Sequence, residues 1–388
     1  MVFDSLKLFF RAKRDMKAFN ALPQKDRKIV FYAEDTHSKI HFEGIISQLT
    51  AKYGETICYL TSAHDDTVLH SSDDRIKKFY IGDGLIRSVA FRTLKADLVI
   101  MTMPDLENYH LKRSQTYPVH YLYLFHAMVS THSNYRQAAF DHYDTVFCTG
   151  PFQINEIRAT EKIYGLKPKH LYKDGYRRLE SIINDVKKHR ASVGEPSVNG
   201  VKTVIIAPSW GENAILESCG IKTISVLLEA GYRTIVRPHP MTTKHKPELI
   251  NSIISQFANH QRFQLQTDIR DHKTLYESHV MISDWSGVAM EYAFACERPV
   301  IFIDVPKKCN NPEADRVTQI PIEVSIRDKI GKIIPPNQLD LLPKAIEDIY
   351  QDSEKFIEQI RQTRDVSVFN LGNSLNGAVE EILKIANK

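Results

Sequence analysis

Short apolar runs alternate with amphipathic stretches along the first half of the chain. Five runs have the length and the β-branched or aromatic content of buried strands: "KIVFYA" (28–33), "TICYL" (56–60), "ADLVIM" (96–101), "VHYLYLF" (119–125) and "DTVFCTG" (144–150). Four stretches around them carry apolar residues at helical spacing: 41–54, 85–94, 135–140 and 153–164. Strand–helix–strand order of this kind predicts an α/β unit with a parallel, doubly wound sheet.

The same pattern returns after about residue 200. Strands are predicted at "KTVIIAP" (202–208), "YRTIVRP" (232–238), "VMIS" (280–283) and "RPVIFI" (298–303). Helices are predicted before Gly231, at 247–257, between the last two strands, and at 339–350, 353–363 and 373–388. The chain is therefore predicted to hold two α/β units in series.

Breaks in the pattern divide the chain into five parts. Residues 1–22 are predicted to form an amphipathic N-terminal helix that Pro23 ends, and 23–190 the first α/β domain. Residues 191–200, rich in Gly, Pro, Ser and Asn, are the predicted linker. Residues 201–365 are predicted to form the second α/β domain, and 366–388 a C-terminal helix that is expected to return to the first domain.

The N-terminal helix carries apolar residues on one side and many bases. The apolar set is Val2, Phe3, Leu6, Phe9 and Phe10, and the basic set is Lys7, Arg11, Lys13, Arg14 and Lys17. Such a helix is typical of one lying in a membrane interface. A helix packed on the body of the protein explains the pattern equally well, and the sequence leaves both interpretations open.

Composition narrows the class of protein. The 388 residues are 43% hydrophobic and 25% charged, which suits two ordinary globular domains. The formal net charge is only +4, and no nucleic-acid partner is expected. The five cysteines lack the spacing of a zinc site or a disulfide framework, and we expect no metal centre. With no apolar run of about 18 residues and no signal-peptide pattern, a cytoplasmic protein is expected.

Polar residues gather at the turn of "VMISDWSGVAMEYAFACERPVIFID" (280–304). Ser283, Asp284, Ser286 and Gly287 stand where a strand ends and a helix begins, and Glu291 lies one helical turn further on. A helix that starts at the carboxyl end of a parallel strand points free N–H groups at a ligand, which suits a nucleotide diphosphate. Glu291 is placed to reach ribose hydroxyls. The plain alternative is a helix cap with a solvated glutamate.

A second candidate group is "TIVRPHPMTTKHK" (234–246). Arg237 and His239 follow a strand directly, and the prolines on either side of His239 stiffen their loop. An arginine there suits phosphate contact, and His239 suits stabilisation of a phosphate oxyanion or a leaving phosphate. The alternative is a basic surface loop.

A third candidate is His126, at the end of the apolar strand in "HYLYLFHAM" (120–128). A histidine titrates near neutrality and is able to take a proton from an acceptor hydroxyl. A lone histidine at a strand end is more often structural, but a nucleotide site in the other half of the chain favours the catalytic interpretation.

Seven segments, taken in order, resemble the CDP-glycerol glycerophosphotransferase family, which makes teichoic-acid-type polymers. They are "FYAEDTHSKIHFEGI", "LFHAM", "YDTVFCTG", "KDGYRRLE", "VIIAPSW", "VRPHP" and "ISDWSGVAMEYA", and they span about residues 29–303. The resemblance implies a GT-B fold: two facing Rossmann-like domains with parallel sheets and a cleft between them. The acceptor would lie in the first domain and the CDP-activated donor in the second.

The resemblance also implies roles for individual residues. His126 would be the base and His239 would act near the donor pyrophosphate. Donor binding would fall to Arg237, Ser283, Asp284, Ser286, Gly287 and Glu291. Arg177, which matches a G-x-P-R turn incompletely, and Ser209 are further candidates for phosphate contacts.

The implied reaction moves a glycerol-phosphate or related alditol-phosphate group from a CDP-alcohol to a hydroxyl of a cell-envelope glycan or lipid-linked acceptor, and releases CMP. No D-x-D metal motif occurs, so no obligate cofactor is expected, although Mg²⁺ could accompany the donor. The expected location is the cytoplasmic face of the membrane, reached through the N-terminal helix. A GT-B glycosyltransferase or epimerase using a nucleotide sugar, and a non-catalytic nucleotide-binding partner in envelope assembly, stay open.

Overall fold

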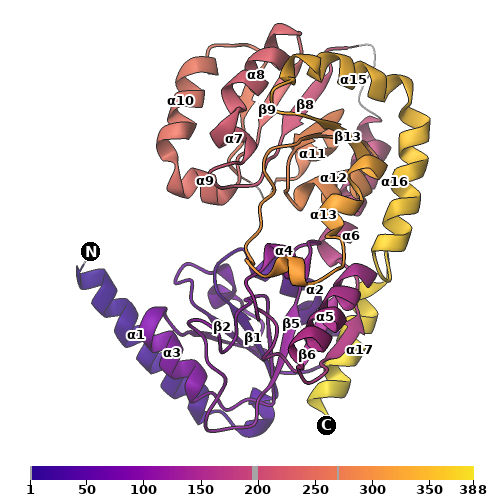
Figure 1. Ribbon diagram of the computed structural model, residues 1–388. Helices are drawn as coiled ribbons and strands as arrows, with labels where there is room; N and C mark the ends of the chain where they lie inside the picture. Colours follow the sequence, from indigo (N-terminus) through magenta and orange to yellow (C-terminus); the bar gives the residue numbers. More distant parts are fainter. Residues whose placement is uncertain (1, 195–199, 269–270) are drawn as a thin grey trace.

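Two parallel sheets, one in each half of the chain, organise the computed structural model (Figure 1). The structure describes residues 2–194, 200–268 and 271–388. Figure 1 shows the two halves facing each other, with the long helix α16 (Ser353–Ser367) running beside both.

The first sheet has seven parallel strands. Their spatial order is β3 (Ile76–Tyr80), β2 (Ile57–Thr61), β1 (Ile29–Ala33), β4 (Leu98–Met101), β5 (His120–Leu124), β6 (Thr145–Cys148) and β7 (His170–Lys173). The central strand β1 is buried over its whole length, as expected for a strand covered on both faces.

The second sheet has six parallel strands. Their order is β10 (Phe263–Leu265), β9 (Arg233–Val236), β8 (Thr203–Ile206), β11 (Val280–Ser283), β12 (Val300–Ile303) and β13 (Gly331–Ile334). The strand order reverses between the neighbouring strands β8 and β11, since β8 is followed by β9 on one side and β11 by β12 on the other. In parallel α/β sheets, ligands bind at the carboxyl ends of strands at such a reversal.

Helices cover both sheets. In the first half they are α1 (Val2–Ala21), α2 (Lys39–Ala51), α3 (Gly84–Arg92), α4 (Thr131–Asn134), α5 (Pro151–Tyr164) and α6 (Arg177–Val193). In the second half they are α7 (Ile215–Ser218), α8 (Gly220–Glu229), α9 (Pro240–His245), α10 (Pro247–Phe257), α11 (Lys273–Glu277), α12 (Val288–Cys296), α13 (Ile322–Ser325), α14 (Arg327–Ile330) and α15 (Leu342–Gln351). The last helix is α17 (Ser374–Ala386).

Side chains alternate between the two faces of the first sheet. Phe31 of β1 packs with Phe42 of α2 and Val379 of α17 on one face, while its neighbour Tyr32 packs with Phe91 of α3 on the other. This alternation is the period-2 geometry of a strand. The C-terminal helix α17 thus completes the core of the first half, far from it in sequence.

Helix α1 is buried along part of its length only. Ala12, Met16 and Phe19 pack toward β3 and α3, whereas Leu6 and Phe10 are 52% and 60% exposed. Packing on the body of the protein therefore accounts for the second half of this helix. It does not account for the apolar side chains nearer its start.

Two sequence predictions of secondary structure need correction. The helix predicted at 135–140 is absent: α4 ends at Asn134, and an irregular turn follows in which Ala138 has a φ of +63°. Its apolar spacing has another cause, because Tyr135 and Phe140 pack together in an aromatic cluster. Helix α6 continues to Val193, three residues into the predicted linker, and residues 195–199 of that linker lie outside the described residues.

Candidate active site

The loop after β5 in the first half meets the start of α12 in the second half. A Cβ built on Gly287 would lie 3.2 Å from Val129 Cγ1 and 3.9 Å from the Ala127 Cβ. His126 immediately precedes these two residues. Glycine at position 287 therefore lets the predicted phosphate-binding turn approach the loop of the predicted base.

His126 lies two residues beyond the end of β5. Its Nδ1 is 3.3 Å from the hydroxyl of Tyr123, and its backbone carbonyl accepts a hydrogen bond from the hydroxyl of Tyr176 at 2.8 Å. Burial lowers the pKa of His126, against a smaller raising effect of the Asp35 charge. The imidazole is therefore neutral at pH 7 and able to accept a proton.

His41, on α2, is a neighbour of His126 that sequence reasoning did not single out. Its ring centroid lies 6.1 Å from that of His126. Burial, followed by the charges of His126 and Arg178, holds its pKa well below the ordinary value. Only its place in the first family-like segment, "FYAEDTHSKIHFEGI", could have drawn attention to it.

His239 is the N-cap residue of α9. Its Nδ1 accepts the backbone N–H of Met241 at 3.1 Å. Burial and the nearby ammonium of Lys308 lower the pKa of His239 to about 4, so the ring is neutral at pH 7. Because Nδ1 is an acceptor, the one ring proton sits on Nε2. His239 is therefore a hydrogen-bond donor, which suits an oxyanion better than proton abstraction.

The turn after β11 divides into a buried part and an accessible part. The hydroxyl of Ser283 is fully buried and donates to the carbonyl of Ala207 at 2.7 Å. Asp284 is also buried, and its carboxylate accepts backbone N–H groups of Ser209, Ile215 and Trp285. In this structure both side chains hold the loop after β8 in place. The predicted contact of Ser283 and Asp284 with the donor stays a prediction, and a donor would have to compete with these bonds.

Ser286 and Gly287, half-buried, are the accessible part of that turn. Gly287 is the N-cap of α12, a helix of 9 residues whose first N–H groups point away from the sheet. An anion is stabilised at this position by the N–H groups and by the helix dipole. Ser209, whose backbone N–H is fixed by Asp284, lies beside it in the loop after β8.

Glu291 is buried where α12 packs against α6. Its carboxylate accepts a hydrogen bond from the Tyr176 hydroxyl at 2.8 Å and pairs with the Nε of Arg178 at 3.1 Å. Tyr176 thus touches both Glu291 and the backbone of His126. A ribose would have to share the Glu291 carboxylate with these partners.

Arg237 is buried beyond the end of β9, and its guanidinium donates to the carbonyl of Asp271 at 3.1 Å. Burial, followed by the like charge of Arg178, lowers the pKa of Arg237 to about 10. Both guanidinium groups stay charged at pH 7. The two guanidinium groups repel each other, and both interact with Glu291. An anionic ligand bound between them would reduce this repulsion.

Comparison with known proteins identifies the family of the chain. Residues 16–308 match the family described as CDP-Glycerol:Poly(glycerophosphate) glycerophosphotransferase. The chain belongs to this glycerophosphotransferase family. The prediction of a CDP-glycerol glycerophosphotransferase-type enzyme is thereby confirmed. No curated protein sequence matches the chain.

Solved structures share the fold of this glycerophosphotransferase. The wall teichoic acid polymerase TagF, a His-to-Asn variant soaked with CDPG, is 12% identical with a TM-score of 0.60 over 100% of this chain and 98% of TagF. The UDP-GlcNAc 2-epimerase of Neisseria meningitidis bound to UDP-GlcNAc is 12% identical, with a TM-score of 0.56 over 92% and 100% of the two chains. A glycosyltransferase of Rickettsia africae is 14% identical, with a TM-score of 0.52 over 92% and 98%.

These similarities and the two parallel sheets confirm the predicted α/β, GT-B fold of the glycerophosphotransferase. Within residues 2–194, 200–268 and 271–388, no three His, Cys, Asp or Glu side chains are grouped as a metal site would require. Over the same residues, no helix combines the length and apolar character that crossing a membrane demands.

Arg177, which the sequence suggested for a phosphate contact, pairs with a buried carboxylate in this structure. Its two terminal nitrogens each donate to one carboxylate oxygen of Asp174 at 2.8 Å, and 15% of its side chain is exposed. Such a bidentate pair is directional and costly to break when buried. The adjacent Arg178 instead pairs with Glu291 of α12 and so connects the two halves of the glycerophosphotransferase.

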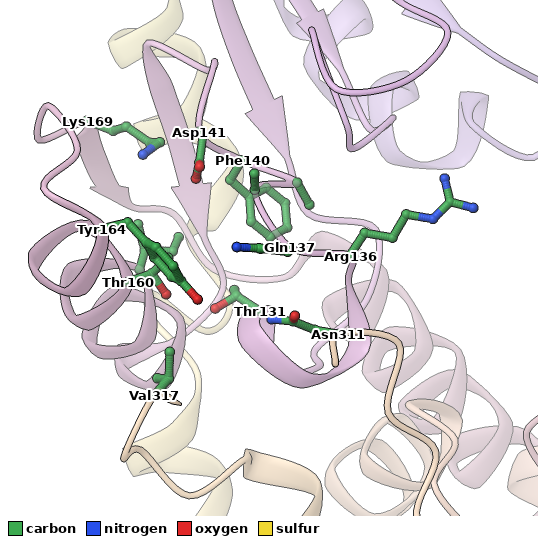
Figure 2. A pocket seen from close by; sticks show the side chains of 13 residues that line it. Thr131, Arg136, Gln137, Phe140, Asp141, Thr160, Tyr164, Lys169, Asn311 and Val317 are labelled. Carbon is green, nitrogen blue, oxygen red and sulfur yellow. The ribbon is translucent and has the colours of Figure 1, made fainter. Parts of the chain in front are cut away.

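A separate pocket lies between the first half and the segment before α13 (Figure 2). The space that the centre of a water-sized sphere can occupy in it is only about 30 Å³. Thr131, Gln137 and Tyr164 point toward one another across it, and Asn311 of the second half closes one side (Figure 2). None of the predicted site residues lines this pocket, so it is distinct from the candidate site at the strand ends.

Two buried glutamates lie near this pocket at the junction of the halves. Glu323 of α13 accepts hydrogen bonds from the backbone N–H of Ser130 and the side-chain amide of Asn134. Burial raises the pKa of Glu323 from 4.5 to about 7, and the charge of Glu156 adds to the rise. The folded state therefore holds a proton on Glu323 that the unfolded chain releases.

We expect Glu323→Gln to flatten the pH dependence of stability. Because the folded pKa is raised, the native protein loses stability as pH rises from 4.5 to about 7, by at most about 3 kcal/mol. Glutamine keeps an acceptor oxygen for Ser130 and Asn134 without the charge. Urea unfolding at pH 5 and pH 8 measures the difference, with Glu358→Gln on the surface of α16 as the control. If the free energy of unfolding fell by the same amount from pH 5 to pH 8 in Glu323→Gln and in the wild type, the prediction would be wrong.

Proposed function

We propose that the protein transfers the glycerol-phosphate group of CDP-glycerol to a hydroxyl of a cell-envelope acceptor and releases CMP. The observation that carries the proposal is the approach of the His126 loop to the start of α12, where a Cβ on Gly287 would lie 3.2 Å from Val129 Cγ1. The loop of a neutral base and the N–H donors of a helix start therefore lie next to each other. Membership of the glycerophosphotransferase family supports CDP-glycerol as the donor.

In the proposed mechanism the acceptor oxygen attacks the β-phosphorus of CDP-glycerol. The hydroxyl proton passes to the neutral imidazole of His126, and the bond between the β-phosphorus and the CMP oxygen breaks with its electron pair left on CMP. His239 Nε2–H, Arg237 and the N–H groups at Ser286 and Gly287 stabilise the charge on the phosphate oxygens. Glu291 binds the ribose. Holding both reactants in one cleft lowers the barrier further.

A donor panel tests this function. Purified protein is incubated with a lipid-carried poly(glycerol phosphate) oligomer and, in turn, CDP-glycerol, CDP-ribitol or UDP-GlcNAc. We expect CMP to be released from CDP-glycerol only when the acceptor is present. Release of UDP from UDP-GlcNAc instead would replace the proposal with a nucleotide-sugar enzyme. Thermal stabilisation by donors without any turnover would indicate a binding protein.

We further propose that the enzyme works at the cytoplasmic face of the membrane and docks through α1 and α3. Leu6, Phe10, Lys13 and Lys17 share one face of α1, because they are spaced by three or four residues. On α3, which contacts α1, Leu85 is 86% exposed. An exposed face that mixes apolar and basic side chains is typical of helices lying in an anionic membrane interface.

The double variant Leu6→Ser, Phe10→Ser is expected to bind anionic liposomes at least about tenfold more weakly, because two apolar side chains no longer leave water on docking. Liposome sedimentation measures the binding. Ile320→Ser, which removes another exposed apolar side chain from the second half, is the control and is expected to bind like the wild type. Unchanged sedimentation of the double variant would rule out docking through α1.

A further inference from the structure

Lys308, in the loop after β12, rests on the ring of Trp210. Its Nζ is 3.8 Å from the centre of the indole and donates a hydrogen bond to the backbone carbonyl of Trp210 at 2.9 Å. A cation held over an aromatic face is attracted by the ring quadrupole. The ammonium is thus fixed in position by two contacts with one residue of the loop after β8.

The Trp210 ring also faces the predicted phosphate site. Its centroid lies 6.1 Å from that of His239, with the two rings inclined by 30°. The positive charge of Lys308 lowers the pKa of His239. The carboxylate of Asp284 in turn acts to raise the pKa of Lys308. Lys308 therefore stands among the residues that follow β8, β9 and β11, at the carboxyl edge of the second sheet.

Lys308 forms no ion pair in the described part of the chain, because no Asp or Glu oxygen there lies within 4.0 Å of its Nζ. The carboxylates of Asp284 and Glu217 act on its charge from a longer distance. The carboxylate of Asp284 already accepts three backbone N–H groups. An ammonium has three donors, and one of them bonds to the Trp210 carbonyl, which leaves donor capacity for a ligand.

We propose that Lys308 is a catalytic residue that binds the diphosphate of the donor, with Trp210 as the platform that positions it. This inference rests on the proposed function. As the bond between the β-phosphorus and the CMP oxygen breaks, its electron pair stays on the CMP phosphate. Lys308 stabilises that charge, while the proton of the acceptor hydroxyl goes to His126. The neutral Nε2–H of His239 and the ammonium of Lys308 act on the same diphosphate from neighbouring loops.

The chain offers a matched control in Lys307, the exposed neighbour of Lys308. Lys308→Met and Lys307→Met remove the same charge from the same loop and keep a side chain of similar length. We expect Lys308→Met to lower kcat with CDP-glycerol on the order of 100-fold and Lys307→Met to leave it within about twofold. Lys308→Arg, which keeps the charge, is expected to restore activity to within about tenfold of the wild type.

Binding separates a phosphate contact from a structural effect. Calorimetry with CDP and with cytidine is expected to show CDP affinity at least about tenfold weaker in Lys308→Met, because a charge-assisted contact is lost. Cytidine, which carries no phosphate, is expected to bind all variants alike. Trp210→Leu is expected to weaken CDP binding as Lys308→Met does, and Trp210→Phe to weaken it less. Circular dichroism melting checks that each variant is folded.

The outcomes distinguish this proposal from the function on which it rests. If the wild type releases no CMP from CDP-glycerol but binds CDP or UDP, the proposed function fails. The comparison of Lys308→Met with Lys307→Met on that diphosphate then still decides the role of Lys308. Equal diphosphate affinity in these two variants overturns the role. So does a wild type that binds neither diphosphate.

Discussion

Replacing His126 by alanine is expected to lower kcat by a factor on the order of 10³, within the range that a positioned general base contributes. The imidazole is neutral because burial lowers its pKa, and its loop approaches the start of α12. Water could replace it as proton acceptor only with poor orientation. CMP release at saturating CDP-glycerol measures the loss.

His120→Gln is the control for His126→Ala, because the two histidines stand at opposite ends of β5. His120 begins the strand and bonds to the hydroxyl of Thr145, away from the cleft. This variant is expected to keep its turnover. In the wild type, the acid limb of the pH profile of kcat/KM is expected below pH 6.5, since the pKa of His126 is lowered. Full activity of folded His126→Ala would remove the histidine from the mechanism.

The central strands of both sheets could be predicted from the sequence, and the edge strands could not. Every strand that was missed, β3, β7, β10 and β13, lies at an edge of its sheet. Central strands are buried on both faces and therefore consist of continuous apolar runs. Edge strands are short or carry lysines, as in "IKKFY" of β3, which protects an exposed edge but hides the strand pattern.

The sequence was sufficient to predict which site residues follow the end of a strand. It was not sufficient to predict which hydrogen bonds and ion pairs these residues form. Both Ser283 and Ser286 flank the same turn, yet one hydroxyl is buried against Ala207 and the other residue is half-buried at the helix start. The partners of Arg177 and Arg178 also differ, because Arg177 pairs with Asp174 and Arg178 pairs with Glu291. Arg177 forms its ion pair with Asp174, which lies three residues before it in the sequence. Spacing fixes which residues are near a strand end, whereas tertiary packing decides which of them faces the cleft.

His239→Ala is expected to lower kcat by a factor of about 10² to 10³. This is the loss typical of removing one hydrogen-bond donor to an oxyanion, which is the role that a neutral His239 can have. Its pKa of about 4 leaves no charge to lose between pH 6 and 8. The variant is therefore expected to keep the shape of the wild-type pH profile while its rate is lower at every pH. A change in the shape of that profile would instead make His239 an acid or a base in the reaction.

Two further substitutions separate the donor role of His239 from its role as the cap of α9. Asparagine is a good helix cap, so His239→Asn is expected to keep the contact with the Met241 N–H and melt like the wild type, yet to lose activity because its amide does not reach as far as Nε2. Glutamine places an N–H₂ group closer to that position, and His239→Gln is expected to recover at least about tenfold in kcat over alanine. If asparagine were as active as the wild type, the function of His239 would be confined to the cap. If glutamine and alanine were equally impaired, the hydrogen bond from Nε2 would not be the interaction that stabilises the phosphate.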